Sequence, residues 1–168
     1  MIPSDHFVRF YNEVFKFLDE RNALKPYYDE ISRHQELHCL ELFKREGLKG
    51  MYDYWEHIRI EENCDLELKL TDDAMTAYMR HCPSLSKVTD NDAGACPKYC
   101  MHCAGWILPL MTKAGFFCVF DLIDPARPEC CYSIFKSAEA ARAHRNKLIA
   151  AGHKAEYIAT NIPDEKQA

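Results

Sequence analysis

The hydrophobic pattern changes from helical spacing to strict alternation near residue 64, and this change constrains the fold more than any other feature. Every second residue from 66 to 70 is a leucine with charged residues between, which is typical of a half-buried strand near 64–70. Residues 71–73 (Thr-Asp-Asp) predict a tight turn, and a second alternating segment covers 74–81. Because strands joined by a short turn pair antiparallel, the sequence predicts a β-hairpin here.

The rest of the chain predicts helices before the hairpin and mixed elements after it. Upstream, apolar residues recur at helical spacing in three segments, the second opened by Pro26 and ended by Gly47. Downstream, we expect a helix over 97–113, strands over 116–123 and 130–136, and a last helix over 138–151; a short edge strand within 153–160 stays open. The predicted fold class is α+β: N-terminal helices, then a four-stranded antiparallel β-β-α-β-β sheet with a covering helix and a C-terminal helix. We expect one domain over 1–168, with a helical part (1–60) and a sheet-plus-helix part (61–160).

Composition and charge exclude several classes of protein. The net charge is −5 and no stripe of Lys or Arg occurs, so nucleic acid is not an expected partner. No apolar run reaches the roughly 18 to 20 residues that span a bilayer, so no membrane segment is expected. The first residues lack a basic segment followed by an apolar run, and we expect a cytoplasmic protein. Nine cysteines, an odd number, favour reduced thiols over a disulfide framework.

The stretch from Cys96 to Cys103 holds three thiols and the His102 imidazole within eight residues. Its C-x-x-x-C-x-x-C spacing occurs in radical S-adenosylmethionine enzymes, but this chain has too few alternating strands and helices for their fold. A second interpretation is a metal site, with zinc as the candidate metal. Its ligands would come from five residues: Cys82, Cys96, Cys100, His102 and Cys103. In a third interpretation the thiols pack as small apolar groups on a helix that faces the sheet.

The same stretch is compatible with catalysis. A thiol near a helix N-terminus has a lowered pKa, which favours Cys96 or Cys100 as a nucleophile. His102 or His81 could act as its base, and we select Cys100 with His102. Asp90 and Asp92 would orient the base or bind metal, or they are only turn residues of an Asn/Asp/Gly loop. Only about a dozen residues separate the strand end at Cys82 from the stretch. We therefore expect one pocket to bring together the following side chains: Cys82, Cys96, Cys100, His102 and Cys103.

The order of motifs resembles a family of bacterial proteins. The hairpin ends in Cys82-Pro83, Cys100 lies in a Cys-rich helix start, Gly115-Phe116 opens a strand, and Cys131 to Phe135 form the next. This layout, over residues 60–137, is similar to proteins grouped with the L-2-amino-thiazoline-4-carboxylic acid hydrolases, which are distantly similar to sensing domains of the 4-vinyl reductase type. The resemblance implies a pocket between helix and sheet that accepts a small molecule.

Two classes of function remain open at this point. The first is a thiol- or metal-dependent hydrolase that acts on a small C–N or C–S substrate. The second is a non-catalytic ligand- or zinc-binding module, such as a sensor. The N-terminal segments also carry a surplus of aromatic residues, and Phe15 and Phe17 lie off the expected stripe of Phe7, Phe10 and Tyr11. That surplus predicts a second contact surface and a homodimer.

Overall fold

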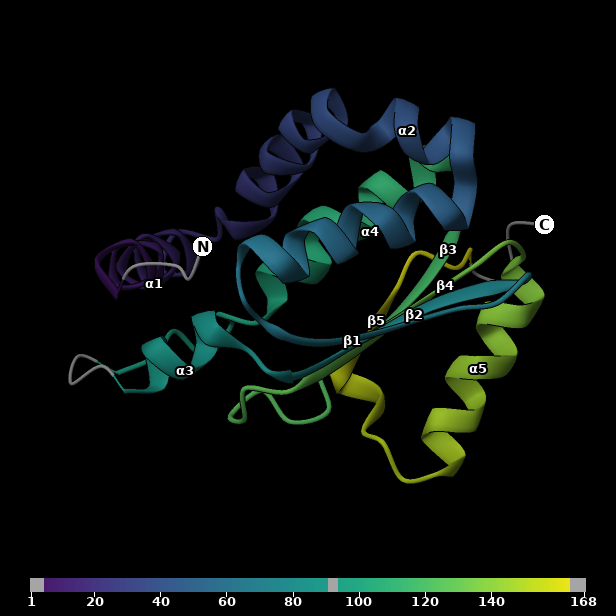
Figure 1. Ribbon diagram of the computed structural model, residues 1–168. Helices are drawn as coiled ribbons and strands as arrows, with labels where there is room; N and C mark the ends of the chain where they lie inside the picture. The colour runs from purple at the N-terminus through teal and green to yellow at the C-terminus, as the bar shows by residue number, and fades with distance from the viewer. Residues whose placement is uncertain (1–4, 91–93, 164–168) are drawn as a thin grey trace.

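The computed structural model describes residues 5–90 and 94–163 as helices packed on both faces of an antiparallel sheet (Figure 1). The sheet order is β1-β2-β4-β3-β5, and every neighbouring pair is antiparallel. The strands are β1 (Asp65–Leu70), β2 (Ala74–His81), β3 (Phe117–Asp121), β4 (Cys130–Phe135) and β5 (Ile158–Thr160). The α+β class is therefore confirmed, as are the positions of the four predicted strands.

The helices form two layers and an N-terminal extension (Figure 1). They are α1 (Asp5–Asp19), α2 (Leu24–Glu61), α3 (Pro83–Thr89), α4 (Met101–Ala114) and α5 (Ala138–Ala150). Helices α2 and α4 cover one face of the sheet and α5 the other, while α1 packs against α3. Within the described ranges, no helix combines the length and apolar character that crossing a bilayer requires.

Three details differ from the expectations. The sheet has five strands, because residues 158–160 return to the edge of the sheet and pair with β3. The segment after the hairpin forms α3, with Pro83 in its first turn and the Cys82 sulfur accepting the Leu85 N–H at 3.4 Å. Helix α4 begins at Met101 rather than at 97, because residues 96–101 close i,i+3 turns such as Tyr99 N–H to the Cys96 carbonyl.

The predicted helices over 26–47 and 48–58 are two arms of α2. Gly47 has φ 60° and ψ −141°, a conformation that L side chains rarely adopt, and the chain reverses direction there (Figure 1). The second arm then crosses the sheet beside α4. Gly47 thus ends the first arm, as the sequence predicted, and the two arms of α2 are helices that meet at this kink.

Most buried apolar residues belong to one cluster, which we call the sheet core. It packs the inner face of β1–β4 against α2 and α4 and includes Phe43, Met51, Met75, Met111, Phe120 and Ile134, each at most 1% exposed. Alternate strand residues point to the opposite face, where the Phe135 ring lies 5.2 Å from the His144 ring of α5. The alternation that predicted the strands therefore also separates the two layers of helix.

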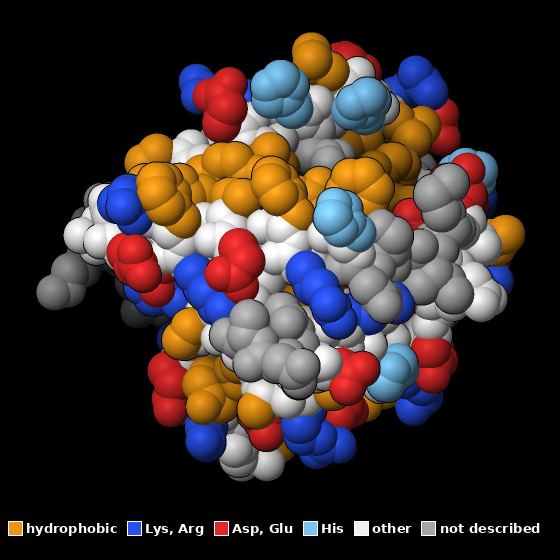
Figure 2. Space-filling model, turned by 90° about the vertical axis from the view of Figure 1, so that its left-hand side faces the viewer, with side chains coloured by type: hydrophobic (Ala, Val, Ile, Leu, Met, Phe, Trp, Pro, Cys, Tyr) orange, Lys and Arg blue, Asp and Glu red, His pale blue; other side chains and the backbone are white. Residues whose placement is uncertain are grey.

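A second cluster, the N-terminal cluster, lies between α1, α3 and the start of α2. Its buried members are Val8, Phe15, Leu24, Tyr28, Leu85, Val88, Cys96 and Tyr99. The stripe predicted for α1 was wrong in its first turns: Val8 and Phe15 are buried, whereas Phe7 and Phe10 are each 61% exposed. A helix that is apolar on several sides does not reveal which side packs. On the α1 side of the molecule, hydrophobic side chains form a band at the surface (Figure 2).

Candidate functional site

Two predicted site residues, Cys82 and Cys100, lie at helix starts. Cys82 is the N-cap of α3 and Cys100 the N-cap of α4. The Cys82 N–H donates to the Pro128 carbonyl at 2.6 Å, which ties α3 to the turn before β4. Cys100 packs against both hydrophobic clusters, with its Sγ 4.0 Å from the Pro125 carbonyl oxygen.

Four half-buried thiols form what we call the thiol cluster: Cys82, Cys100, Cys103 and Cys130. They lie close enough to perturb one another electrostatically. Burial, and then the neighbouring thiols, raise the pKa of Cys103 well above its ordinary value, and burial raises the pKa of Cys100 to about 12. Burial also raises the pKa of Cys82 and Cys130. All four are therefore protonated at neutral pH.

The expectation that a helix N-terminus would lower a thiol pKa was wrong. Burial raises the pKa of Cys96 as well as that of Cys100, because removing a thiolate from water costs more than a helix dipole returns. Cys96 is 3% exposed and belongs to the N-terminal cluster. Its N–H donates to Asn12 Oδ1 at 2.8 Å.

The clearest chemical arrangement is a thiol–imidazole pair at the start of α4. Cys103 Sγ lies 3.2 Å from His102 Nε2, and His102 Nδ1 contacts the Tyr99 carbonyl oxygen. A carbonyl can only accept a hydrogen bond, so Nδ1 carries the proton and Nε2 offers its lone pair to the Cys103 thiol. The imidazole expected to serve Cys100 therefore faces Cys103 instead.

Aromatic rings surround the His102 imidazole. The rings of Phe15, Tyr99 and Trp106 lie 5.4, 5.0 and 4.7 Å away between centroids. Burial lowers the pKa of His102 to about 4, so the imidazole is neutral at pH 7 and able to accept a proton. A neutral base, fixed by one hydrogen bond and directed at a protonated thiol, is the arrangement that nucleophilic catalysis requires.

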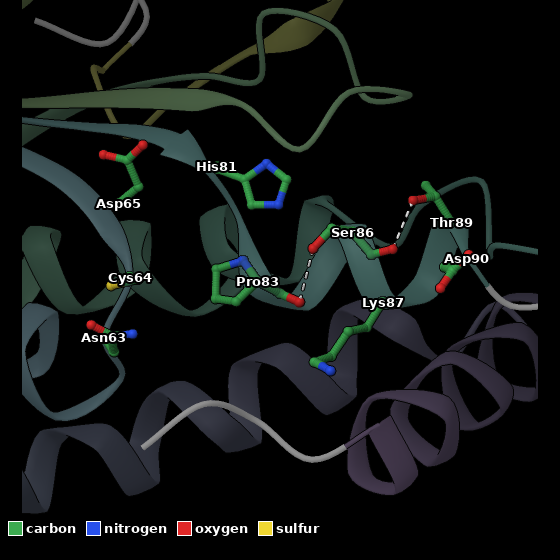
Figure 3. A pocket seen from close by; sticks show the side chains of 9 residues that line it. All are labelled: Asn63, Cys64, Asp65, His81, Pro83, Ser86, Lys87, Thr89 and Asp90. Carbon is green, nitrogen blue, oxygen red and sulfur yellow. Dashed lines mark hydrogen bonds between the residues drawn. The ribbon is translucent and has the colours of Figure 1, made fainter.

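Helix α3 separates the remaining predicted residues into two cavities. On one side an open hollow of about 700 Å³ contains His81 and Asp90 together with Cys64 and Asp65 (Figure 3). The hydrogen bonds drawn there are internal to α3, such as Ser86 Oγ to the Pro83 carbonyl oxygen at 3.2 Å. None of those drawn joins the His81 ring to a carboxylate or a thiol. This hollow therefore resembles a polar surface depression more than a catalytic centre.

On the other side of α3, Cys96 and Cys100 line a cavity of about 350 Å³, which we call the thiol cavity. Asp124, which sequence reasoning did not select, lies in its wall. Asp90 belongs to the opposite hollow, so it does not orient a base beside Cys100. Asp92 lies outside the described residues.

The predicted zinc set is not assembled in the structure. Within residues 5–90 and 94–163, no three His, Cys, Asp or Glu side chains are arranged to hold a metal ion. Cys96 packs in the N-terminal cluster, and the His102 nitrogens face Tyr99 and Cys103. In the described part of the chain, the thiol cluster is a set of neighbouring protonated thiols.

One cavity was missed entirely by sequence reasoning. It measures about 480 Å³ and lies between the start of α2 and α4, and we call it the α2–α4 cavity. Tyr28 is in its wall, and the Tyr28 hydroxyl is buried without a hydrogen-bond partner among the described residues. Such a group costs about 1–3 kcal/mol of stability. One sign of it was present in the sequence: Gly105 lies in the middle of α4. A glycine there lowers helix stability, so its presence suggests that another side chain packs closely against the helix at that point.

Comparison of the chain with protein-family models, with curated proteins and with solved structures finds no match. The site is therefore interpreted from its own chemistry.

Proposed function

We propose that the protein is a thiol-dependent hydrolase of a small molecule with a C–N or C–S bond, in which Cys103 is the nucleophile and His102 its base. One observation carries the proposal: the 3.2 Å contact between Cys103 Sγ and His102 Nε2, with His102 Nδ1 held by the Tyr99 carbonyl. This is the order nucleophile, base and orienting group.

The reaction would proceed in two steps. Cys103 Sγ attacks the electrophilic carbon of the substrate while its proton passes to His102 Nε2, and the same proton then goes to the departing nitrogen or sulfur. Water next gives a proton to His102 and its oxygen to the carbon, which releases the product and restores the Cys103 thiol. Burial lowers the pKa of His102 to about 4, so the imidazole is neutral at pH 7 and its Nε2 lone pair is free; it takes the proton only as the bond from Cys103 Sγ to carbon forms.

A small substrate would approach from the thiol cavity, whose wall includes Cys100 and Tyr99, next to the pair, but neither Cys103 nor His102. Cys100 lines the cavity, and Cys103 follows three positions later, so the two residues are neighbours on one face of the chain around the start of α4. Cys100 contributes to the raised pKa of Cys103, which agrees with this proximity. The nine cysteines are all free, which agrees with action in a reducing compartment such as the bacterial cytoplasm.

The rate of Cys103 alkylation by iodoacetamide, followed by peptide mass spectrometry across pH, tests the pair. Base assistance by neutral His102 predicts a rate that is flat between about pH 5 and pH 8. An unassisted thiol of high pKa instead gains about tenfold per pH unit, because only its thiolate reacts. His102→Gln should convert the first profile into the second.

Cys39 provides an internal control in the same experiment. It is buried and has a raised pKa of about 11, and its Sγ contacts the Gln35 carbonyl rather than a base. Its rate should rise with pH in both proteins. Parallel profiles for Cys103 and Cys39 in the wild-type protein would refute the proposal.

A second candidate function is non-catalytic binding of a small ligand. It is favoured by the raised pKa values throughout the thiol cluster, which leave no thiolate at neutral pH. Under this alternative, Cys103→Ala lowers stability by about 1 kcal/mol and leaves ligand binding intact.

A further inference from the structure

The start of α4 carries a short motif that the proposed hydrolase uses only in part. Cys100-Met101-His102-Cys103 has the C-x-x-C spacing that dithiol–disulfide proteins use. Cys103 is the proposed nucleophile, whereas Cys100 has no role in that reaction. Both cysteines are free in the structure, so neither thiol is engaged in a disulfide.

The backbone holds these two cysteines at a distance that a disulfide can span. Cys100 has helical dihedral angles, φ −67° and ψ −14°, and the His102 N–H closes the turn around it by donating to the Tyr99 carbonyl at 3.3 Å. Residues three positions apart in a helical turn have Cα atoms about 5 Å apart, within the roughly 4.4–6.8 Å that disulfides join. The Cβ atoms must approach by about 1 Å, which a helix end allows more easily than a helix interior.

The two thiols have different surroundings, which gives them different parts in an exchange reaction. Cys100 lines the thiol cavity of about 350 Å³, so a small molecule in that cavity contacts Cys100 first. Cys103 does not line the cavity, and its Sγ lies 3.2 Å from His102 Nε2. An external disulfide therefore meets Cys100, whereas Cys103 is the thiol that can pass its proton to a neighbouring base.

Cys82 and Cys130 are the competing partners of Cys103. Among the neighbouring thiols, Cys130 contributes most to the raised pKa of Cys103, ahead of Cys82 and Cys100. Cys130 belongs to β4, however, and α4 packs on the sheet mainly at β3 and β5. A bond from Cys103 to Cys130 would have to draw a helix and a strand together, whereas Cys100 and Cys103 belong to one turn.

We propose that Cys100 and Cys103 form a reversible disulfide by exchange with small aliphatic disulfides that enter the thiol cavity. The Cys100 sulfur attacks one sulfur of the external disulfide, which forms a mixed disulfide and releases one thiol that carries the Cys100 proton. Cys103 Sγ then attacks the Cys100 sulfur while its proton passes to His102 Nε2, and the second departing thiol takes that proton. Two protein thiols are oxidised, and one external disulfide is reduced to two thiols.

Incubation with 2-hydroxyethyl disulfide tests the pair, because this reagent is small and uncharged. Residues 99–113 form one tryptic peptide between Lys98 and Lys113, and it contains both cysteines. In the wild-type protein this peptide should lose the mass of two hydrogens without being joined to another peptide, and dithiothreitol should reverse the change. The reaction should accelerate about tenfold per pH unit, because burial keeps Cys100 protonated.

Matched variants separate the two steps. Cys103→Ser should stop at the mixed disulfide and keep one mercaptoethanol group on Cys100, because no thiol is left to displace it. His102→Gln should slow the second step about 100-fold, so the mixed disulfide accumulates before the internal bond forms. Cys130→Ser keeps both partners and should form the disulfide at the wild-type rate.

A disulfide from the 99–113 peptide to Cys82 or Cys130 would overturn the proposal, and so would a 99–113 peptide that stays reduced. The second step rests on the same Cys103–His102 pair as the proposed function, but the two proposals fail separately. Parallel alkylation profiles of Cys103 and Cys39 would refute the hydrolase while the internal disulfide still forms. A flat Cys103 profile without an internal disulfide would refute the exchange and leave the hydrolase.

Discussion

The two hydrophobic clusters of this molecule are built in different ways. The sheet core joins strands and helices through rows of apolar residues that recur at regular spacing. The N-terminal cluster takes its buried members from α1, the start of α2, α3 and the turn at 96–99. The buried side chain of Asn12 links these segments by hydrogen bonds. Its Nδ2 donates to the Gly94 carbonyl, and its Oδ1 accepts from the Cys96 N–H. One cluster therefore rests on periodic sequence, and the other on single contacts between distant segments.

The largest expected effect comes from truncating one aromatic residue in each cluster. Phe43 in the sheet core is 0% exposed and stacks on Trp55 at 5.5 Å; Phe43→Ala should lower the free energy of unfolding by about 3–5 kcal/mol. Phe15→Ala should cost about 3 kcal/mol, but hydrogen exchange should accelerate mainly in α1 and α3 and leave β4 protected. Urea denaturation and exchange mass spectrometry measure the two quantities.

The two clusters do not open separately if Phe15→Ala accelerates amide hydrogen exchange in β4 as much as in α1. The two clusters would then unfold as one cooperative unit, and the distinction between them would be one of sequence only.

A smaller effect is expected from acid at His102, which lies between the clusters. Its pKa is lowered to about 4 by burial, from an ordinary value of about 6.5. The unfolded chain therefore binds the proton more readily, so this contribution to stability is complete above about pH 6.5 and is lost as pH falls toward 4. We expect a loss of about 2–3 kcal/mol across that window, measured by urea denaturation at each pH.

His102→Gln should remove most of this pH dependence, whereas His57→Gln, at an exposed position, should retain it. Both variants should keep a part of the dependence of unfolding free energy on pH, because burial also lowers the pKa of His144. An unchanged slope in His102→Gln would show that the imidazole titrates normally in the folded protein.

The smallest effect on stability concerns the exposed side of α1. We predict that Phe7, Phe10 and Phe17, each more than half exposed, form a homodimer contact at micromolar concentration. Phe10→Ser should change the free energy of unfolding of the monomer by less than about 0.5 kcal/mol and shift the mass from dimer to monomer in light scattering. A wild-type protein that is monomeric at these concentrations would remove this interface.

Regular patterns made the sheet core predictable. The alternation of leucines and charges over 66–70 defined β1, and Gly47 marked the reversal in α2. The sequence did not settle whether β5 forms, because its pairing partner, β3, lies about forty positions earlier and its own three residues carry little pattern. Helix α3 was missed because seven residues are too short for a helical stripe.

Only the proximity of some predicted site residues followed from the sequence. Sequence proximity brought Cys82, Cys100 and Cys103 together, as electrostatic interaction among their thiols indicates. It did not reveal that α3 would place Asp90 in a different cavity, or that His102 would face Cys103. Side-chain direction at a helix start depends on the exact first residue, and α4 begins four residues later than expected.

Asn12 has a consequence for how the chain is synthesised and folds. Its two partners lie 82 and 84 residues further along the sequence. On a ribosome, α1 emerges before Gly94 and Cys96, the distant partners of Asn12, which follow the hairpin and α3 in the sequence. Closing so long a loop is slow, so α1 should dock late, after the local contacts of α2 have formed. Until then its aromatic side chains are available to chaperones, which bind exposed apolar segments of incomplete chains.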